Sequence, residues 1–373
     1  MHDIKKLAVI IALLAAFLIA MEGFVSSDIQ DRAIILGMGV DLDGEQIKVT
    51  TEVVSPGNGA EEVGTYSKTI HATGKSIVDA LKTISEYCGK EASLGQCVLI
   101  VIGKSFAQSQ YFASALDFFV LSQGLRETCS ICFCDGEAAE VLTKADAIGK
   151  SVSLSLSSKF LQQASSVGVP TNNLISFCRS QAENEKSGFL NVVKCISTSN
   201  DDSQNPSVPQ VVFDIESIAV FKDSKYKGTL SSAQADGLSL LNKKTFGQLY
   251  LVLQDGTQMT LQVGQKKVDV KVRDKSVDVK VTLKMRLLET DLKNSESSLE
   301  AKSRSRIRQE TLKQVQREAE EQIASCLAVQ NQYNCDLVGF HELLRQKYGS
   351  SEELFRLPSQ DIPCNVSVSV ENT

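Results

Sequence analysis

Alternation of apolar and polar residues marks two neighbouring segments early in the chain. Residues 33–40 and 47–54 are rich in β-branched side chains and repeat with a period of two, which is typical of strands. A turn ending in the dipeptide Asp43-Gly44 joins them, and this dipeptide favours a tight hairpin. A third alternating segment follows at 65–72. The pattern therefore predicts a β-ribbon at the start of the folded chain.

Helical spacing of apolar residues begins after this ribbon. Residues 76–88 carry apolar side chains three and four positions apart, which predicts an amphipathic helix. A continuous apolar run at 97–102 is typical of a strand buried on both faces. The alternation of strands and helices predicts an α+β or α/β domain with a mixed sheet over residues 28–146. Its further expected elements are a helix at 113–121, a strand at 128–134 and a helix at 137–142.

The signals weaken in the middle of the chain. A helix is expected at 157–164, and Pro170 precedes another. We interpret residues 147–205 as a second, smaller subdomain. Residues 197–209 hold two prolines and almost no apolar residues, which predicts a linker or exposed loop and a domain boundary.

The clearest alternation lies in the last part of the chain. Valine occupies every second position at 268–272 and again at 277–281, on either side of a turn at Asp274-Lys275. This pattern predicts an antiparallel hairpin with one buried and one solvated face. Two shorter hairpins are expected before it, with strands at 218–221 and 228–230, and at 248–253 and 259–263 around Asp255-Gly256.

A long helix is predicted to cover this sheet. Over residues 297–328 the apolar side chains fall on one stripe, which indicates a helix with one buried face. The basic residues lie elsewhere on it, and we interpret them as its solvated face; contact with acidic headgroups or a partner is the alternative. The stripe is Ile307, Val315, Ala319, Ile323, Cys326 and Leu327, and the basic residues are Arg304, Arg306, Arg308, Lys313 and Arg317.

The N-terminal segment is apolar and bears an export signal. Lys5 and Lys6 precede an uninterrupted apolar run at 7–21. If the apolar residues as far as Val25 also lie in lipid, the segment approaches the ~20 residues that a spanning helix needs. We expect residues 1–27 to be a retained signal anchor, and the alternative is a signal peptide cleaved after residue 27, which would give a secreted protein. Both place the rest of the chain outside the cytoplasm.

Taken together, the elements predict an α+β, multi-domain protein in which mixed and antiparallel sheets pack with helices after an N-terminal membrane segment. Residues 206–373 form its C-terminal domain, an antiparallel sheet with a long helix. The length of 373 residues leaves ample core for two or three domains. A net charge of −6 argues against a nucleic-acid partner.

Ten cysteines raise the question of disulfides in an oxidising compartment. Their spacing is irregular and most fall inside predicted strands or helices, so we interpret most as small buried apolar residues. Cys326 and Cys335 bracket a predicted helix end and are the best candidate pair.

Two glycine-containing segments resemble nucleotide-binding loops but lack required residues. The segment Gly74-Lys75-Ser76 lacks the earlier glycine of a phosphate-binding loop, because Thr69 stands there. We expect a turn into a helix with Ser76 as its N-cap. A second segment, residues 37–39, follows a strand as a dinucleotide fingerprint would, but a hairpin rather than a helix comes next.

Two groups of residues could be read as metal ligands, but neither has the arrangement that a metal site requires. Asp41, Asp43 and Glu45 supply carboxylates, but their spacing is not that of a complete calcium loop. In a strand, Cys132 and Cys134 point to one face while Cys129 points to the other, so the three thiols cannot converge on zinc. The sequence therefore predicts no metal, cofactor or metal-ligating residue.

No nucleophile–base arrangement is apparent. The three histidines, His2, His71 and His341, have no local nucleophile partner. Ser224 and Lys227 match a Ser-x-x-Lys spacing, but the companion Lys-Thr-Gly is absent and a hairpin turn is expected there. We predict that the protein is not an enzyme and has no catalytic residues.

Several segments, weak one by one, occur in an order and spacing that together resemble a known family. They are Asp31-Arg32-Ala33-Ile34-Ile35-Leu36-Gly37-Met38-Gly39-Val40-Asp41, Gly74-Lys75-Ser76-Ile77-Val78-Asp79-Ala80-Leu81, Leu116-Asp117-Phe118-Phe119, Ile218-Ala219-Val220-Phe221-Lys222, Asn242, Asp336-Leu337-Val338-Gly339-Phe340, Leu344-Arg345 and Tyr348. Over essentially the whole chain after the N-terminal segment they resemble the Ger(x)C family, the C subunit of bacterial endospore germinant receptors.

The resemblance implies a three-domain α+β protein on the outer face of the spore inner membrane, assembled with two integral-membrane receptor subunits, the A-type and the B-type. It implies a non-enzymatic role in spore germination through protein–protein contacts. Members of the family usually carry an acylated cysteine followed by tryptophan, and Gly23-Phe24 stand at that place, so attachment would depend on the N-terminal helix. The alternative function is a membrane-anchored or secreted extracytoplasmic protein that binds a small molecule.

Overall fold

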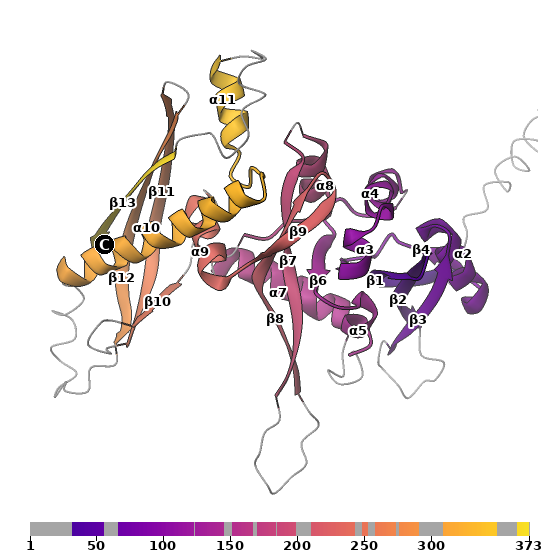
Figure 1. Ribbon diagram of the computed structural model, residues 1–373. Coiled ribbons are helices and arrows are strands. Elements are labelled where there is room, and N and C mark those ends of the chain that lie inside the picture. Colours follow the sequence, from indigo (N-terminus) through magenta and orange to yellow (C-terminus); the bar gives the residue numbers. More distant parts are fainter. Residues whose placement is uncertain are drawn as a thin grey trace, which may run out of the picture.

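The protein, described by a computed structural model, contains two β-sheets with helices packed on them (Figure 1). The α+β class predicted from the sequence is confirmed. The predicted membrane segment at 1–27 lies outside the described residues. These are 32–55, 66–122, 124–144, 151–166, 170–183, 185–198, 210–242, 248–252, 258–273, 276–290, 309–348 and 364–372.

The larger sheet has nine strands in the order β3-β2-β1-β5-β6-β7-β8-β9, with the short β4 paired to β1. Its central strands β1, β5, β6 and β7 are parallel, and the strands toward both edges are antiparallel, so the sheet is mixed as predicted. The strands are β1 (Arg32–Asp43), β2 (Gln46–Ser55), β3 (Tyr66–Gly74), β4 (Glu91–Ser93), β5 (Leu99–Gly103), β6 (Ser130–Cys134), β7 (Ser187–Thr198), β8 (Gln210–Lys222) and β9 (Lys225–Leu230).

The first hairpin forms where the alternation predicts it. β1 and β2 pair from Asp43↔Gln46 to Ile34↔Val54, and Gly44 turns the chain with φ of +59°. Every residue of β5 is buried, as the continuous apolar run predicts. A strand of this kind needs helices on both faces of its sheet.

Helices cover both faces of the nine-stranded sheet. On one face α2, α3, α4 and α8 pack over Ile100 and Ile102 of β5, with four phenylalanines in edge or tilted contact at the centre. On the other face α5 and α7 pack over Leu99 and Val101. The helices are α2 (Ile77–Cys88), α3 (Lys104–Gln108), α4 (Tyr111–Leu121), α5 (Ala138–Leu142), α7 (Val152–Ser166) and α8 (Leu174–Ala182).

The strands β7, β8 and β9 continue this sheet rather than starting another. β7 joins β6 in parallel at Cys132↔Asn191 and runs antiparallel to β8 over most of its length. The sequence-based boundary at 205/206 therefore falls between two neighbouring strands of one sheet. We refer to the nine-stranded sheet with helices α2–α8 and with α9 (Ser232–Leu241), which packs on β8, as the N-terminal unit.

The smaller sheet has the order β10-β11-β12-β13, and α10 lies across one of its faces (Figure 1). Alternate residues of β12 are buried against α10, which confirms the predicted buried face. Of the predicted apolar stripe, the five residues within α10 are buried, while Ile307 lies outside the described residues. This C-terminal unit comprises β10 (Gln248–Val252), β11 (Gln258–Arg273), β12 (Ser276–Thr290), α10 (Gln309–Gln332), α11 (Phe340–Tyr348) and β13 (Cys364–Asn372).

The best candidate pair for a disulfide, Cys326 and Cys335, is not bonded in the structure. Cys326 and Cys335 are both free thiols and both buried. Burial raises the pKa of each to about 12, because an apolar environment disfavours the thiolate. The interpretation of most cysteines as small apolar residues agrees with their packing.

Several predicted features fall on residues that the structure leaves out: the linker at 199–209, the turns at 255–256 and 274–275, and Arg304, Arg306 and Arg308. Among the helices that are described, none is long and apolar enough to cross a membrane.

Candidate functional site

The carboxyl ends of the parallel strands are where open α/β sheets usually bind ligands. In this protein Asp41, at the end of β1, is buried there and its carboxylate accepts hydrogen bonds from the amides of Ala138 (2.7 Å) and Ala139 (2.9 Å). Gly103 makes room for it, because a Cβ on that residue would lie 1.9 Å from Asp41 Oδ1. The first amides of α5 are therefore occupied by the protein's own carboxylate.

The charges around this edge pair with each other. Lys48 contacts Glu137 at 3.1 Å and Lys104 contacts Asp135 at 2.8 Å. Burial raises the pKa of Asp41, while its two backbone hydrogen bonds act in the opposite direction. These contacts fix the ends of β1 and β2 against the start of α5.

A second buried carboxylate serves the next helix in the same manner. Glu52 of β2 is fully buried, and its Oε2 accepts hydrogen bonds from the amide (2.9 Å) and hydroxyl (2.5 Å) of Ser153 at the start of α7. Gly37 lets Ser153 approach, since its Cβ would lie 1.8 Å from Ser153 Oγ. Neighbouring strands thus use one acidic residue each to fix a helix.

The glycine-containing segments have the structural roles expected of them. Ser76 caps α2, its hydroxyl accepting a hydrogen bond from the Asp79 amide at 3.1 Å. Gly37 and Gly39 lie within β1, where Gly39 allows close contact with Ala138. Neither segment cradles an anion.

The three thiols divide between the two faces of the sheet as predicted. Cys129 packs in the core beneath α4 and α8, whereas Cys132 and Cys134 pack toward α5 and α7. A hydrogen bond with Cys97, together with burial, raises the pKa of Cys129. No three histidine, cysteine or acidic side chains gather as metal ligands in the part of the chain that is described.

The remaining candidates are not brought together. His71 is exposed on β3, and His341 is buried at the start of α11. Ser224 lies in the turn between β8 and β9, where Asp223 and Ser224 have φ of +53° and +54°. Its amide donates to Gln181 Oε1 at 2.8 Å.

A tightly constrained contact outside the two cores joins the two units. Helix α9 (Ser232–Leu241) crosses α10 at Gly237, whose Cβ would lie 2.2 Å from the Gln322 carbonyl oxygen and 2.9 Å from Cys326 Cβ. The crossing therefore requires glycine. Buried apolar residues from both units surround it: Phe189, Ile218, Val220, Leu230, Ala235, Leu238, Cys326, Val329 and Cys335.

The end of α10 adds a second close contact. Tyr333 lies against Gly228 of β9, and a Cβ there would lie 2.1 Å from its hydroxyl oxygen. The sequence offered one signal for these contacts, glycine inside an apolar helix or strand pattern, which marks a close approach of another segment. We had not singled out either residue.

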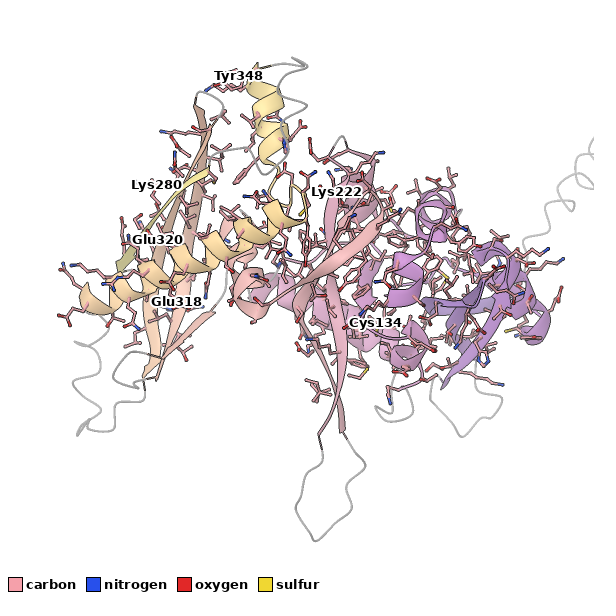
Figure 2. The ribbon with its side chains drawn as sticks, in the orientation of Figure 1. Cys134, Lys222, Lys280, Glu318, Glu320 and Tyr348 are labelled. Carbon is pink, nitrogen blue, oxygen red and sulfur yellow. The ribbon has the colours of Figure 1, made fainter. Side chains whose placement is uncertain are left out.

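A polar cluster borders the crossing, formed by Glu185, Lys222, Asp336 and His341 (Figure 2 labels Lys222). Glu185 and Lys222 belong to the N-terminal unit, Asp336 lies between α10 and α11, and His341 lies in the first turn of α11. These four residues, here called the junction cluster, are too far apart in the sequence for any local pattern to reveal them.

Fold and site together define a two-unit α+β protein whose described residues form a tight inter-unit contact and assemble no recognisable catalytic group. The chain belongs to the spore germination family, as the sequence resemblance indicated. Residues 26–195 match the model for the spore germination protein N-terminal domain, and residues 216–372 match the model described as "Spore germination B3/ GerAC like, C-terminal".

A solved structure has a similar fold. The crystal structure of the GerBC protein aligns with a TM-score of 0.52 at 15% sequence identity, covering 90% of this chain and 96% of that one. At that identity the likeness concerns the fold alone. A search of curated proteins returned no match.

Proposed function

We propose that the protein is the non-enzymatic C subunit of a nutrient germinant receptor in the spore inner membrane. Membership of the family supports a role in spore germination. The observation that carries the more specific proposal is that the two family models together span almost the whole chain after the N-terminal segment. The protein would then act by contacts with two integral-membrane subunits, one A-type and one B-type.

The buried polar groups and the contacts between the two units support a binding role rather than catalysis. The carboxyl ends of the parallel strands, where a substrate would be expected, hold Asp41 bonded to the first amides of α5. The most elaborate contacts instead fix the two units against each other. We infer that the contact between the two units transmits a conformational change from one partner to another.

Attachment is part of the proposal. The apolar segment at 7–21 would hold the chain in the membrane, with the folded units outside the cytoplasm. Because Gly23 stands where related proteins carry the acylated cysteine, the uncut helix would replace the lipid.

The test is fractionation of sporulating cells that express the protein with a C-terminal tag, followed by affinity purification from detergent-solubilised spore membranes. We expect the full-length chain in the membrane fraction together with two multi-pass proteins. An untagged strain is the control for nonspecific recovery. A soluble chain shortened near residue 27 and recovered without multi-pass partners would contradict the proposal and favour a secreted binding protein.

A further inference from the structure

The two units meet through two kinds of contact with different physical character. The α9–α10 crossing is apolar and tightly packed around Gly237, so separating it would expose a buried cluster to water. The junction cluster lies beside it and is polar. A polar contact exchanges partners at lower cost than an apolar core.

One carboxylate oxygen makes a polar contact between the units within the junction cluster. Glu185 Oε2 lies 3.4 Å from His341 Nδ1 across the junction and 3.9 Å from Lys222 Nζ within its own unit. His341 Nδ1 also lies 3.7 Å from Asp336 Oδ2. Glu185 is therefore shared between a cation of the N-terminal unit and an imidazole of the C-terminal unit.

Each side of the cluster has partners within its own unit. Lys222 donates to the Glu185 carbonyl oxygen and lies 3.4 Å from Ser187 Oγ. His341 remains next to Asp336, whose carboxylate is held by the amides of Phe340 (2.9 Å) and His341 (2.8 Å). Opening the contact would leave neither Lys222 nor His341 without its local partner, which avoids the large cost of an uncompensated buried charge.

The burial of the four side chains is uneven. Asp336 and His341 have 2% and 7% of their side chains exposed, whereas Glu185 has 29% exposed. Water can thus reach Glu185, and the Asp336–His341 pair stays in place. Glu185 also precedes β7 in a short turn in which Lys186 has φ of +43°, so it does not belong to the rigid strand.

From this geometry we propose that the junction cluster is a latch and the α9–α10 crossing is its pivot. With Glu185 on His341 the two sheets are held at the angle seen in the structure. With Glu185 released to Lys222 alone, the segment from Asp336 to the first turn of α11 separates from the N-terminal unit, while α9, α10, Tyr333 and Cys335 remain packed. The inference concerns the chain itself and holds whichever receptor or partner the protein serves.

Hydrogen exchange of the purified full-length protein in detergent tests the latch. The variant Glu185→Gln removes the charge, and Glu183→Gln is its control, because Glu183 is an exposed acid in the same turn. We expect Glu185→Gln to raise amide exchange roughly three- to tenfold over residues 336–342, the size of a typical contact coupling. Exchange over 232–241 and 320–328, the pivot, stays as in the parent protein.

The variant His341→Gln supplies the second arm. Because both changes break the same contact, we expect the double variant to show no more exchange than either single variant. Unchanged exchange over 336–342 in Glu185→Gln would overturn the latch. Equal loss of protection at the pivot would also overturn it, since that result means a purely structural role for the cluster.

Discussion

A single glycine sets how closely the two helices at the junction approach. Replacing Gly237 by alanine would place a methyl group 2.2 Å from the Gln322 carbonyl oxygen, so that a helix backbone has to move. The gain in helix propensity, ~1 kcal/mol, is smaller than the overpacking cost of typically 1–3 kcal/mol. We expect Gly237→Ala to lower the free energy of unfolding by about 1–2 kcal/mol in a urea titration.

A matched variant separates this effect from a general intolerance of alanine. At Gly136 a Cβ would meet nothing closer than Cys134 Sγ at 4.0 Å. Gly136→Ala should therefore leave the free energy of unfolding within about 0.5 kcal/mol of the parent value. If both variants lose the same stability, the close crossing is not the cause.

The buried cysteines give a second prediction at this scale. Burial raises the pKa of Cys326 and Cys335 to about 12, and the thiolate is the reactive form. We expect both to resist alkylation at pH 8 in the folded protein and to react once urea unfolds it. Mass spectrometry of peptides from the unreduced protein should find both thiols free, and a linked peptide would contradict this.

Asp41 and Glu52 illustrate how far residue-level prediction from sequence extends. The sequence identified Asp41 as a carboxylate near a turn and rightly gave it no metal loop. Its actual partner is a helix that begins almost a hundred residues later, and Glu52 reaches one later still. Local patterns report which residues are buried, but not which distant backbone amides a buried carboxylate will meet.

At the scale of elements, the sequence predicted strands and helices correctly where buried residues recur at regular spacing. The β1–β2 hairpin, the buried β5 and the alternating β12 were predicted because each has a regular buried face. β8 was predicted as a short strand at 218–221, yet it runs from Gln210 to Lys222. Its first half pairs with β7, and there Phe213 and Ile215 are buried beneath α5 and α7 while Val212 is exposed, a burial that depends on distant helices.

The edge strand β13 is protected by a side chain from α10. Glu320 Oε1 accepts a hydrogen bond from the Val368 amide at 3.3 Å, an amide that would otherwise be free to pair with another chain. We expect Glu320→Ala to cost about 1 kcal/mol and to increase concentration-dependent self-association, measured by analytical ultracentrifugation.

Glu318 provides the comparison, because two residues apart on a helix lie on different sides (Figure 2 labels both). Glu318→Ala removes the same charge from α10 without touching β13. Equal self-association of the two variants would show that the charge itself matters and that the edge contact does not.

A lysine between α9 and the smaller sheet makes the free energy of unfolding depend on pH in the alkaline range. Burial lowers the pKa of Lys266 to about 8, and its ammonium donates to the Ser239 carbonyl oxygen at 2.6 Å. In the unfolded chain a lysine keeps its proton up to a pKa of about 10.4, so between those values the unfolded state binds more protons. This residue's contribution to the free energy of unfolding therefore rises with pH across that window.

The comparison of Lys266→Gln with the parent isolates that contribution. The parent should gain on the order of 1–2 kcal/mol relative to the variant between pH 7.5 and pH 9.5, in urea titrations at both values. The buried cysteines, whose raised pKa values act in the opposite direction, are common to both proteins and cancel. A difference that does not change with pH would contradict a lowered Lys266 pKa.

At the scale of the whole molecule, the nine-stranded sheet spans both regions matched by the family models. A fragment ending at residue 195 would lack β8 and β9, and with them the buried Val220 and Phe221. We expect fragment 28–195 to unfold without cooperativity or to aggregate. Fragment 28–246, which keeps α9, should unfold cooperatively when it is heated and followed by circular dichroism. If both fragments unfold in the same way, the sheet does not depend on β8 and β9.

The parallel pairing of β12 with β13 means that two neighbouring strands are synthesised at different times. β13 joins Val277↔Cys364 through Met285↔Asn372, so the smaller sheet is incomplete until the final strand leaves the ribosome. At 5–20 residues per second the intervening stretch of about 70 residues takes roughly 4–14 s to make. For that interval the edge of β12 that β13 will cover is unpaired, although α10 can already pack on the face of the sheet.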